Sequence, residues 1–376
     1  MKNVLFIIFL SLLTFLSCKH NESGQEAVNP DASPEARALL KFLYDIRGEY
    51  ILSGQHNYIN TGSEYTEEVQ RITGKYPVIW GSDFSFCVQG DNYARFQHCG
   101  PLNLSDPSDS AYFIDLDTEQ ARTDMVEEII RRYRQGHIIT LMWHGCFPSD
   151  GDCCRGNSIW AMENRPSDST WNQLTTDGTV LNNQWKEQMD KIARHLVVLQ
   201  EHHIPVLWRP YHEMNGVWFW WCNKRGNDGF RKLWIMTYDY LTHHHHLNNL
   251  LWVWDTNAPR DIQGDEAFDY ELFYPGDEYV DILAADVYRS DYRPSHYDKL
   301  LDLAKGKPIA LGEVGGLPSP GIIDNQPYWE WFMSWGNLLT RSNPEDKITE
   351  LYQSPRVLTL DRIRRDHKGH ISLVIK

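Results

Sequence analysis

Positive charge is scarce in this 376-residue chain, which has 36 Lys and Arg residues against 51 Asp and Glu residues and a formal net charge of −15 at pH 7. Because proteins bind nucleic acids mainly through Lys and Arg on the phosphates, this balance argues against a nucleic-acid partner. It also disfavours electrostatic attachment to an anionic membrane surface. The aromatic content is high instead, with 15 Trp and 19 Tyr, and it favours ligands with apolar faces on which rings can stack.

Several motifs are missing. Neither GxGxxG nor GxxxxGK(S/T) occurs, so the chain lacks the glycine-rich loop with which open α/β sheets bind nucleotide phosphates. CxxC and HExxH are absent as well, which leaves a metal site built from His144, Cys146, Cys153 and Cys154 without supporting spacing. After the N-terminal leader there is no low-complexity linker and no sequence repeat. We therefore expect a single domain that uses neither a metal nor an organic cofactor.

The one long apolar run lies at the N-terminus. Lys2 precedes it, and "FLSC" closes it at Cys18, after which the sequence becomes polar. The run is too short for a comfortable membrane span and predicts a bacterial lipoprotein signal peptide over residues 1–17, with acylation of Cys18 as the lipid anchor. An ordinary cleaved signal peptide is the alternative. We expect an exported lipoprotein on the outer membrane of a Gram-negative cell, with a flexible tether over 18–34 and one globular domain over 35–376.

The cysteines that follow Cys18 are Cys87, Cys99, Cys146, Cys153, Cys154 and Cys222. Export implies an oxidising compartment, in which disulfides persist. Six thiols allow fifteen ways of full pairing, and the sequence indicates only that a local link between Cys87 and Cys99 is plausible.

Short apolar segments alternate with helix-like segments such as 118–136 and 182–203, which is the pattern of βα units around a parallel sheet. Eight segments have strand character: 49–57, 77–85, 137–145, 204–213, 250–257, 280–288, 307–315 and 328–337. Each begins apolar and ends in polar or aromatic residues, which are His56, Asp83, His144, Glu213, Asp255, Tyr288, Glu313 and Trp335. Because parallel barrels carry their sites at the C-terminal strand ends, the asymmetry predicts an α/β fold, a (β/α)8 TIM barrel.

Two of these strand ends carry a glutamate. The segment "WRPYHEMNGVWFWW" (208–221) places Glu213 among an Arg, a His and an Asn and just before three tryptophans, and Glu313 lies in "LGEVG". Both would face the mouth of one barrel. Glycoside hydrolysis needs two such carboxyl groups, one protonated to give a proton to the leaving oxygen and the other ionised. A single strand-end glutamate is often only a salt-bridge partner, but two among His, Trp and Tyr favour the catalytic interpretation.

Together, "RPYHEMNGVWFWW" and "GEVG" resemble glycoside hydrolase family 26, whose founding activity is endo-β-1,4-mannanase. The resemblance extends over nearly the whole mature chain, from "ILSGQHN" to "LTLDRI". It implies a (β/α)8 barrel and a retaining mechanism, with Glu213 as the acid/base and Glu313 as the nucleophile. It also implies internal cleavage of a β-mannan, namely mannan, galactomannan or glucomannan.

The family's other site positions fall on seven residues of this chain. They are His212 near the nucleophile, Tyr288 as a hydrogen-bond donor to the nucleophile, His144 and Asp286 toward the sugar next to the scissile bond, and Trp160, Trp218 and Trp335 as aromatic surfaces. We interpret Arg209 and Asn215 as supporting residues outside direct contact with the sugar.

Three alternatives remain open. The same fold and mechanism could act on mixed-linkage β-glucan or xylan, because substrate choice depends on contacts to the 2-hydroxyl of the sugar. The stacking tryptophans would also suit a non-catalytic glycan-binding lipoprotein, although such a protein has no need for both glutamates. The histidines alone would suit a metal-dependent esterase or deacetylase, but no ligand triad at the strand ends supports it.

Overall fold

The computed structural model describes residues 26–89, 94–97, 117–154, 156–161 and 165–374. In this part of the chain, parallel strands form a closed barrel in the order β1, β2, β5, β7, β8, β9, β10 and β11, and β11 pairs back with β1. These strands are β1 (Ile51–His56), β2 (Ile79–Asp83), β5 (Ile138–Trp143), β7 (Val206–Pro210), β8 (Leu250–Asn257), β9 (Ile282–Val287), β10 (Ile309–Val314) and β11 (Trp329–Ser334). Each lies inside one of the eight predicted segments, so the predicted (β/α)8 barrel is confirmed.

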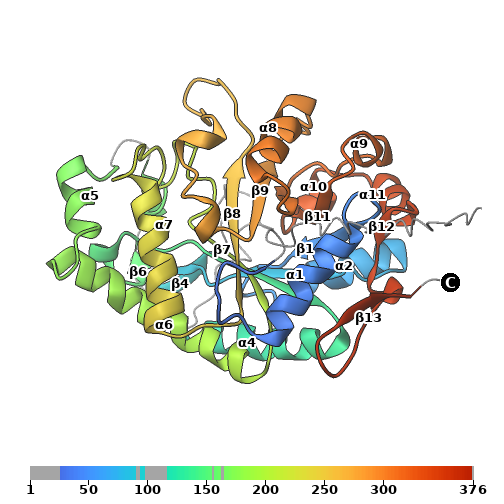
Figure 1. Cartoon of the computed structure of the whole chain (residues 1–376), viewed down its shortest axis with the longest axis horizontal. Coiled ribbons are helices and arrows are strands. Elements are labelled where there is room, and N and C mark those ends of the chain that lie inside the picture. Colours follow the sequence, from blue (N-terminus) through green and yellow to red (C-terminus); the bar gives the residue numbers. More distant parts are fainter. Residues whose placement is uncertain (1–25, 90–93, 98–116, 155, 162–164, 375–376) are drawn as a thin grey trace, which may run out of the picture.

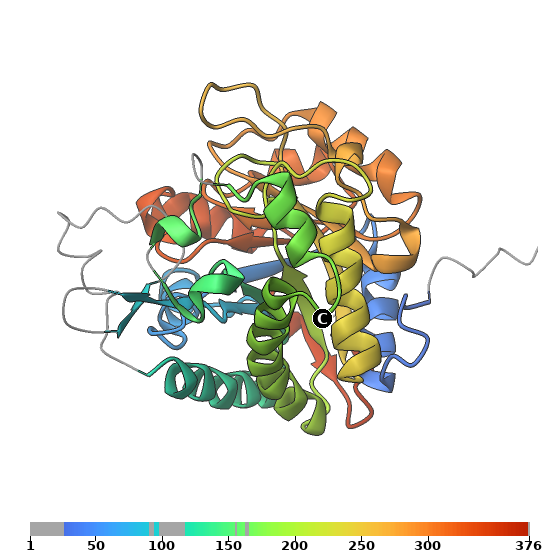
Figure 2. The same cartoon turned by 90° about the vertical axis from the view of Figure 1, so that its left-hand side faces the viewer.

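Helices surround the barrel (Figures 1 and 2). They are α1 (Pro34–Ile46), α2 (Glu64–Thr73), α4 (Thr118–Gln135), α5 (Asp168–Leu174), α6 (Val180–Glu201), α7 (Phe230–Asp239), α8 (Pro294–Ala304), α9 (Pro320–Asn325), α10 (Leu338–Arg341) and α11 (Glu345–Gln353). The two helices predicted over 118–136 and 182–203 correspond to α4 and α6. The side chain of Asp117 caps α4 by accepting the backbone N–H of Glu119, and α4 ends at Gly136, whose φ of 112° favours glycine.

Several shorter strands lie outside the closed barrel, and the sequence pattern did not predict them. They are β3 (Phe86–Gln89), β4 (Ala94–Gln97) and β6 (Cys153–Cys154) in one three-stranded sheet, β12 (Val357–Leu358) beside β1, and the hairpin of β13 (Ile363–Arg365) and β14 (Ile371–Leu373). Strands of two to four residues are too short to show the alternation that identifies longer ones.

Alternate positions along the strands enter two apolar clusters, as the two-residue period of a strand requires. Leu207, Leu251 and Val253 belong to the smaller cluster, whereas Trp208 and Trp252 belong to the larger one. The smaller cluster also contains the buried side chains of α1, so α1 closes the N-terminal end of the barrel. The C-terminal strand ends are left for the site.

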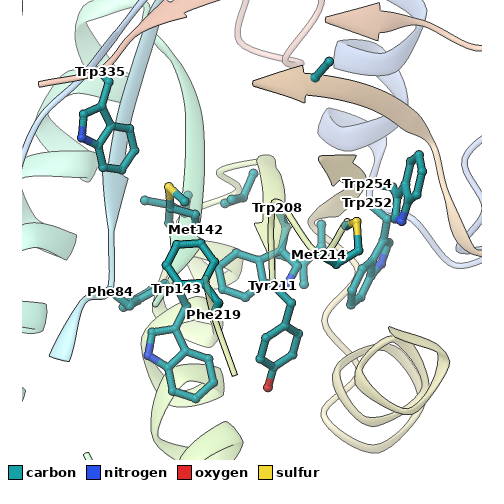
Figure 3. Close-up of a cluster of buried hydrophobic side chains, with 14 of the residues drawn as sticks. Phe84, Met142, Trp143, Trp208, Tyr211, Met214, Phe219, Trp252, Trp254 and Trp335 are labelled. Carbon is teal, nitrogen blue, oxygen red and sulfur yellow. The ribbon is translucent and has the colours of Figure 1, made fainter. Parts of the chain in front are cut away.

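Figure 3 shows part of the larger cluster, around β5 and β7. Trp143 and Tyr211 lie with their ring centroids 6.3 Å apart, and Trp208 is fully buried beside Phe84 at 6.0 Å. Aromatic side chains bury large apolar areas, so this packing fixes the strands that lead into the site.

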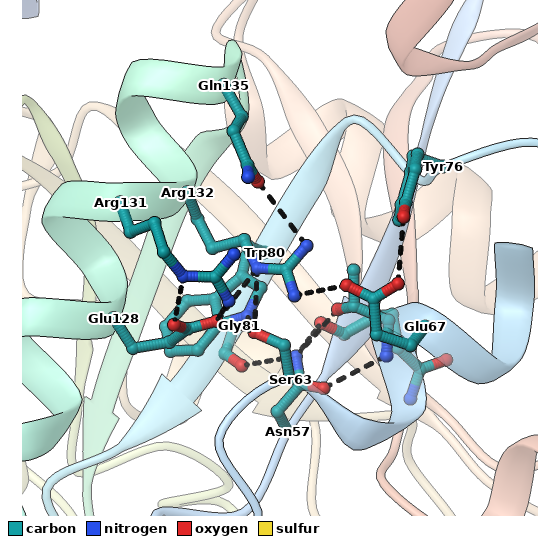
Figure 4. A network of polar contacts seen from close by, with 12 residues as sticks. Asn57, Ser63, Glu67, Tyr76, Trp80, Gly81, Glu128, Arg131, Arg132 and Gln135 are labelled. Atoms are coloured by element: carbon teal, nitrogen blue, oxygen red, sulfur yellow. Dashed lines mark hydrogen bonds and ion pairs between the residues drawn. The ribbon is translucent and has the colours of Figure 1, made fainter.

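A buried polar network joins α2 and α4 to the strand ends of β1 and β2 (Figure 4). Arg132 donates to the hydroxyl of Ser63 and to a carboxylate oxygen of Glu128, both at 2.8 Å, and it also pairs with Glu67. The indole N–H of Trp80 donates to the same Ser63 hydroxyl at 2.8 Å. Because Arg132 is 2% exposed and pairs with two carboxylates, the network fixes the orientation of both helices.

The first described residues pack against the barrel. The backbone N–H of Val28 donates to the carboxylate of Asp281 at 2.7 Å, and the Tyr238 hydroxyl donates to the carbonyl oxygen of Val28 at 2.9 Å. The N–H of Ser33 donates to the Asn248 carbonyl oxygen at 2.6 Å. These contacts fall inside the predicted tether, so its residues 28 and 33 are held on the barrel; residues 18–25 lie outside the described residues. Of the helices in the described part of the chain, none has both the length and the apolar run that crossing a bilayer requires.

Candidate active site

A cavity of about 420 Å³ opens at the C-terminal ends of the barrel strands. Eight of the nine predicted site residues line it, namely His144, Trp160, His212, Glu213, Trp218, Tyr288, Glu313 and Trp335. Asp286 does not line it. A larger open groove of about 640 Å³ runs between α9 and α11, but its lining includes four carboxylate side chains and no strand end. The strand-end cavity is therefore the candidate active site.

The turn after β7 carries Glu213 in an unusual backbone conformation. Tyr211 and Glu213 have φ angles of 52° and 54°, in the left-handed region that costs a non-glycine residue about 1–2 kcal/mol. Surrounding contacts hold the turn. The N–H of Glu213 donates to the carbonyl oxygen of Asp255 at 2.8 Å, and the Trp221 indole N–H donates to the carbonyl oxygen of His212 at 2.7 Å. Strain of this kind is typical of residues whose side chains must point into a site.

The three tryptophans after Glu213 have different tasks. Trp220 and Trp221 are buried at 1% and 0% exposure, and the Trp220 indole N–H donates to the carbonyl oxygen of Gly145 at 2.9 Å. Both pack the turn that carries the glutamate. Only Trp218 lines the cavity. Segment 208–221 therefore combines polar residues that form the site with tryptophans that hold the strained turn in place.

Both carboxylate oxygens of Glu213 accept a hydrogen bond from a neutral donor. The Trp218 indole N–H donates to Oε2 at 2.6 Å, and the Asn257 side-chain amide donates to Oε1 at 2.5 Å. The Trp218 ring lies so close to Gly216 that a Cβ there would approach the ring to 2.4 Å. The glycine therefore lets the indole reach Glu213.

Glu313, on β10, has a charged partner and a phenol. Arg209 donates to Oε1 at 3.3 Å, and the Tyr288 hydroxyl donates to Oε2 at 2.7 Å. The Nε2 atom of His212 lies 3.8 Å from Oε1. Burial lowers the pKa of His212 well below its ordinary value, with the neighbouring His144 and Arg209 adding to the effect, so this ring is neutral. Arg209 supplies the positive charge beside Glu313.

A fully buried charged layer lies beneath the cavity. Arg209 donates to the carboxylate of Asp255 and lies 3.7 Å from an oxygen of Asp286. A Cβ on Gly312 would approach the Asp255 carboxylate to 2.3 Å, so the glycine before Glu313 makes room for this layer. Burial raises the pKa of Asp286 well above its ordinary value, and the negative charge of Asp255 adds to the rise. Asp286 is 0% exposed, and its contact with sugar stays a prediction.

The two candidate catalytic carboxyl groups titrate as one buried pair. Burial raises the pKa of Glu213 to about 7 and that of Glu313 to about 8. The negative charge of an ionised Glu213 adds to the rise of the Glu313 pKa, so the pair releases its two protons in separate steps. Arg209 and Tyr288 lower the pKa of Glu313, and Asn257, Arg260 and Trp218 lower that of Glu213, but only Glu313 accepts a hydrogen bond from a charged donor, Arg209. We therefore assign the negative charge to Glu313 and the shared proton to Glu213.

Histidine and tryptophan side chains complete the wall. His144 contacts the Asp83 carboxylate through Nδ1 at 2.9 Å and through its backbone N–H at 3.0 Å, which fixes the ring orientation. Trp335 stacks on His56 with the ring centroids 3.8 Å apart, so one face of this indole is already covered. Trp160 lines the cavity next to Phe219, with which its backbone forms an isolated bridge.

The cysteines near the site do not form a thiolate metal site. Cys146 and Cys154 are joined by a disulfide, and Cys153 is disulfide-bonded as well. Cys222 is a buried free thiol that donates to the carbonyl oxygen of Glu213 at 3.2 Å, so it is part of the turn that presents the glutamate. The predicted Cys87–Cys99 link involves Cys99, which lies outside the described residues.

Two groups among the described residues have metal-ligand atoms within 4.8 Å of one another. His212, Glu213 and Asp286 form one of them, and the first two of these line the cavity. Arg209 lies 3.7 Å from Asp286, so this carboxylate already has a fixed positive charge beside it. The other group is Asp190, His244 and His245, on the protein surface away from the strand ends.

Four polar residues of the cavity were missed by the sequence analysis: Asn257, Arg260, Asp265 and Arg289. Asn257 had a usable signal, because it ends a predicted strand and shares a face with Asp255 two residues earlier. The other three lie on loops after β8 and β9, where no periodic pattern indicates which side chains turn inward.

The profile of glycosyl hydrolase family 26 matches residues 28–93 and 112–362 of this chain. A mannan endo-1,4-beta-mannosidase of Thermothelomyces thermophilus is 32% identical over 356 residues, which cover 89% of this chain and 63% of the relative. One from Bacillus subtilis is 30% identical over 363 residues, covering 89% of each chain. The chain spans only 50% to 63% of the length of the first four curated relatives that it matches.

Solved structures agree with this match. GH26A from a Muricauda species has a TM-score of 0.78 and 44% identity, covering 89% of this chain and 99% of its own. A beta-mannanase from a symbiotic protist of the termite Reticulitermes speratus, complexed with gluco-manno-oligosaccharide, has a TM-score of 0.70 and 27% identity. That alignment covers 90% of this chain and 97% of the protist enzyme.

Proposed function

The chain belongs to glycosyl hydrolase family 26, and from this premise we propose that it is a retaining endo-β-1,4-mannanase. The observation that carries the proposal is the pair of buried glutamates, Glu213 and Glu313, in one aromatic-lined cavity at the C-terminal strand ends. Glu313 accepts a hydrogen bond from the charged Arg209, whereas both donors to Glu213 are neutral, and this difference suits a nucleophile beside an acid.

The reaction proceeds in two displacements. Glu313, ionised beside Arg209 and Tyr288, attacks the anomeric carbon while Glu213 gives its proton to the departing glycosidic oxygen. The bond to the leaving sugar breaks, and an ester between Glu313 and the anomeric carbon forms. Glu213, now ionised, takes a proton from water, whose oxygen attacks the same carbon and releases Glu313. Two inversions give net retention, for which the carboxyl groups of such enzymes stand about 5–5.5 Å apart.

The proposed substrates are mannan, galactomannan and glucomannan. The names of the mannosidase relatives and the oligosaccharide in the protist structure support this choice. In our proposal His144, which lines the cavity, and Asp286 are both directed at the sugar next to the scissile bond. Mixed-linkage β-glucan and xylan are the alternatives on the same fold.

We expect short manno-oligosaccharides as the first products when residues 26–376 are incubated with linear mannan or galactomannan. A chain cut at internal bonds loses length quickly, so chromatography over time should show a spread of oligosaccharides before mannose or mannobiose accumulates. Parallel incubations with mixed-linkage β-glucan and xylan test the substrate. Cleavage of either of these in place of mannan would leave the proposed mechanism standing and contradict the proposed substrate. Binding to mannan without any product would contradict the proposal that the protein is an enzyme.

We further propose that the protein is exported and held on the outer membrane by a lipid on Cys18. The N-terminal apolar run that ends at "FLSC" supports this, and Cys18 lies outside the described residues. Cells fed labelled palmitate should label the full chain but not a Cys18→Ala variant. A label that survives in the variant would contradict the anchor.

A further inference from the structure

The loop after β8, residues 258–269, forms one wall of the cavity next to Glu213. Its base is tied together, because the backbones of Arg260 and Ala267 exchange two hydrogen bonds of 2.9 Å. The side-chain amide of Asn215 also donates to the carbonyl oxygen of Phe268 at 2.8 Å. A loop tied in this way holds its side chains in fixed positions. Arg260, at 14% side-chain exposure, points from it into the cavity wall.

Arg260 contacts both groups that donate hydrogen bonds to Glu213. Its guanidinium carbon lies 4.9 Å from the ring centroid of Trp218, whose N–H donates to Oε2 of the glutamate. Its Nη1 donates to Oδ1 of Asn257, which turns the Asn257 amide nitrogen toward Oε1 of the glutamate. Since an amide has an acceptor end and a donor end, Arg260 decides which end Glu213 meets.

Asp265 fixes Arg260 in turn. The Nε of Arg260 donates to the carbonyl oxygen of Asp265 at 2.8 Å, and Nη2 donates to Oδ1 at 2.5 Å. The other carboxylate oxygen of Asp265 accepts from Arg289 at 2.6 Å. These contacts therefore connect the acid/base Glu213, through Arg260 and Asp265, to Arg289. Arg289 is adjacent in sequence to Tyr288, which donates a hydrogen bond to the nucleophile.

We propose that Arg260 is a positioning residue for the acid/base: by holding the Trp218 ring and the Asn257 amide, it keeps Glu213 directed at the oxygen of the scissile bond. The inference rests on the proposed function, because it assigns a role in that reaction. Glu213 must present a proton in the first displacement and accept one in the second, from the same position. Two fixed N–H donors supply that position, and small misplacements of a catalytic group are costly.

The charges around Glu213 give the proposal a pH-dependent readout. Burial raises the pKa of Glu213 most, Arg260 lowers it and Asp255 raises it. Other titratable or charged side chains face this site from every neighbouring element: His144 after β5, Arg209 on β7, His212 and Cys222 in the segment after β7, Asp265 in the loop itself, Asp286 on β9, Tyr288 and Arg289 after β9, and Glu313 on β10. An Arg260 variant leaves all of them in place. Loss of the guanidinium therefore raises the pKa of Glu213, so the acid stays protonated to higher pH and the basic limb of kcat/KM moves upward.

Arg260→Met is expected to lower kcat/KM on a manno-oligosaccharide by about 10- to 100-fold, because the general acid loses its alignment. The basic limb should move to higher pH in the same variant. On an aryl β-mannobioside with a strongly acidic phenol, which departs without a proton, the loss should stay below about threefold. Arg260→Lys retains the charge without the fork of donors, so its basic limb should stay near that of the wild type while its rate remains reduced.

Arg289→Met is the matched control, since it removes the other arginine from Asp265 without touching Trp218 or Asn257. Its basic limb should coincide with that of the wild type. Equal losses on both substrates in Arg260→Met, with an unmoved limb, would show that Arg260 only shapes the cavity wall and would overturn the inference.

A measurement without turnover separates this inference from the proposed function. Carbon-13 NMR of glutamate carboxyl groups, with Glu213→Gln used to assign the signal, reports the protonation of Glu213 directly. If the titration midpoint of Glu213 shifts upward in Arg260→Met but the wild-type protein cleaves no β-mannan, the influence of Arg260 on Glu213 stands and the proposed mannanase activity is rejected. An unshifted midpoint in a chain that does cleave β-mannan would reject the inference alone.

Discussion

Glu313→Gln is expected to reduce kcat/KM on β-1,4-mannan by about 10⁴- to 10⁶-fold, because the amide cannot form the glycosyl-enzyme ester. The substitution keeps the size of the side chain and leaves an acceptor for Tyr288, so the fold should persist. Initial rates on a soluble mannan, measured with substrate well below KM, give the ratio directly.

A second buried glutamate provides the matched control for this experiment. Glu330 lies near the start of β11, at the closed end of the barrel, with its carboxylate 3.9 Å from Nε of Arg47. Burial raises its pKa well above the ordinary value, so the neutral amide of Glu330→Gln resembles the native side chain. Because the position is remote from the cavity, Glu330→Gln should keep activity within about twofold of the wild type. Comparable losses in the two variants would mean that burial of a glutamate, and not nucleophilic attack, explains the first result.

Glu213→Gln is expected to lower kcat/KM on mannan by about 10²- to 10⁴-fold, the range in which general acid–base catalysis contributes. The loss should depend on the leaving group. With an aryl β-mannobioside whose phenol needs no proton, the first displacement proceeds and the glycosyl-enzyme accumulates, because no base activates water in the second. Azide, an anion that needs no base, should then restore turnover and give a β-mannosyl azide.

The azide product also tests the assignment of the two glutamates. A β-configured azide arises only if the sugar has already been inverted once by Glu313. An α-configured azide from Glu213→Gln, together with a β-configured azide from Glu313→Gln, would exchange the roles. No rescue in either variant would remove the covalent intermediate from the mechanism.

The barrel could be predicted from the sequence because its strands are buried on both faces. Segments such as "LLWVWDTN" are apolar until their last residues, and those last residues point into the open end. Glu213 and Glu313 could be located for the same reason, since each follows an apolar run on its strand. Their pairing across 100 positions follows from the closure of the barrel and from no local feature.

Other features depend on contacts between distant segments and are not encoded in a local pattern. Val28 lies in a polar leader, yet it packs on the barrel because Asp281 accepts its N–H. Asp286 occupies a strand position that suggests a sugar contact, and its charged neighbours Arg209 and Asp255 come from two other strands. Arg260 lies on a loop whose path is set by its own pairing with Ala267. Which buried charged side chains pair with one another can be determined only from the folded structure.

Proton NMR of the anomeric signals during the first minutes of manno-oligosaccharide hydrolysis by the wild-type protein distinguishes a double displacement from a single one. A double displacement with Glu313 as nucleophile releases the β-anomer first, and mutarotation then produces the α-anomer. We therefore expect the β-signal to dominate at early times. An α-anomer as the first product would show a single inverting displacement and would contradict the role assigned to the glutamate pair.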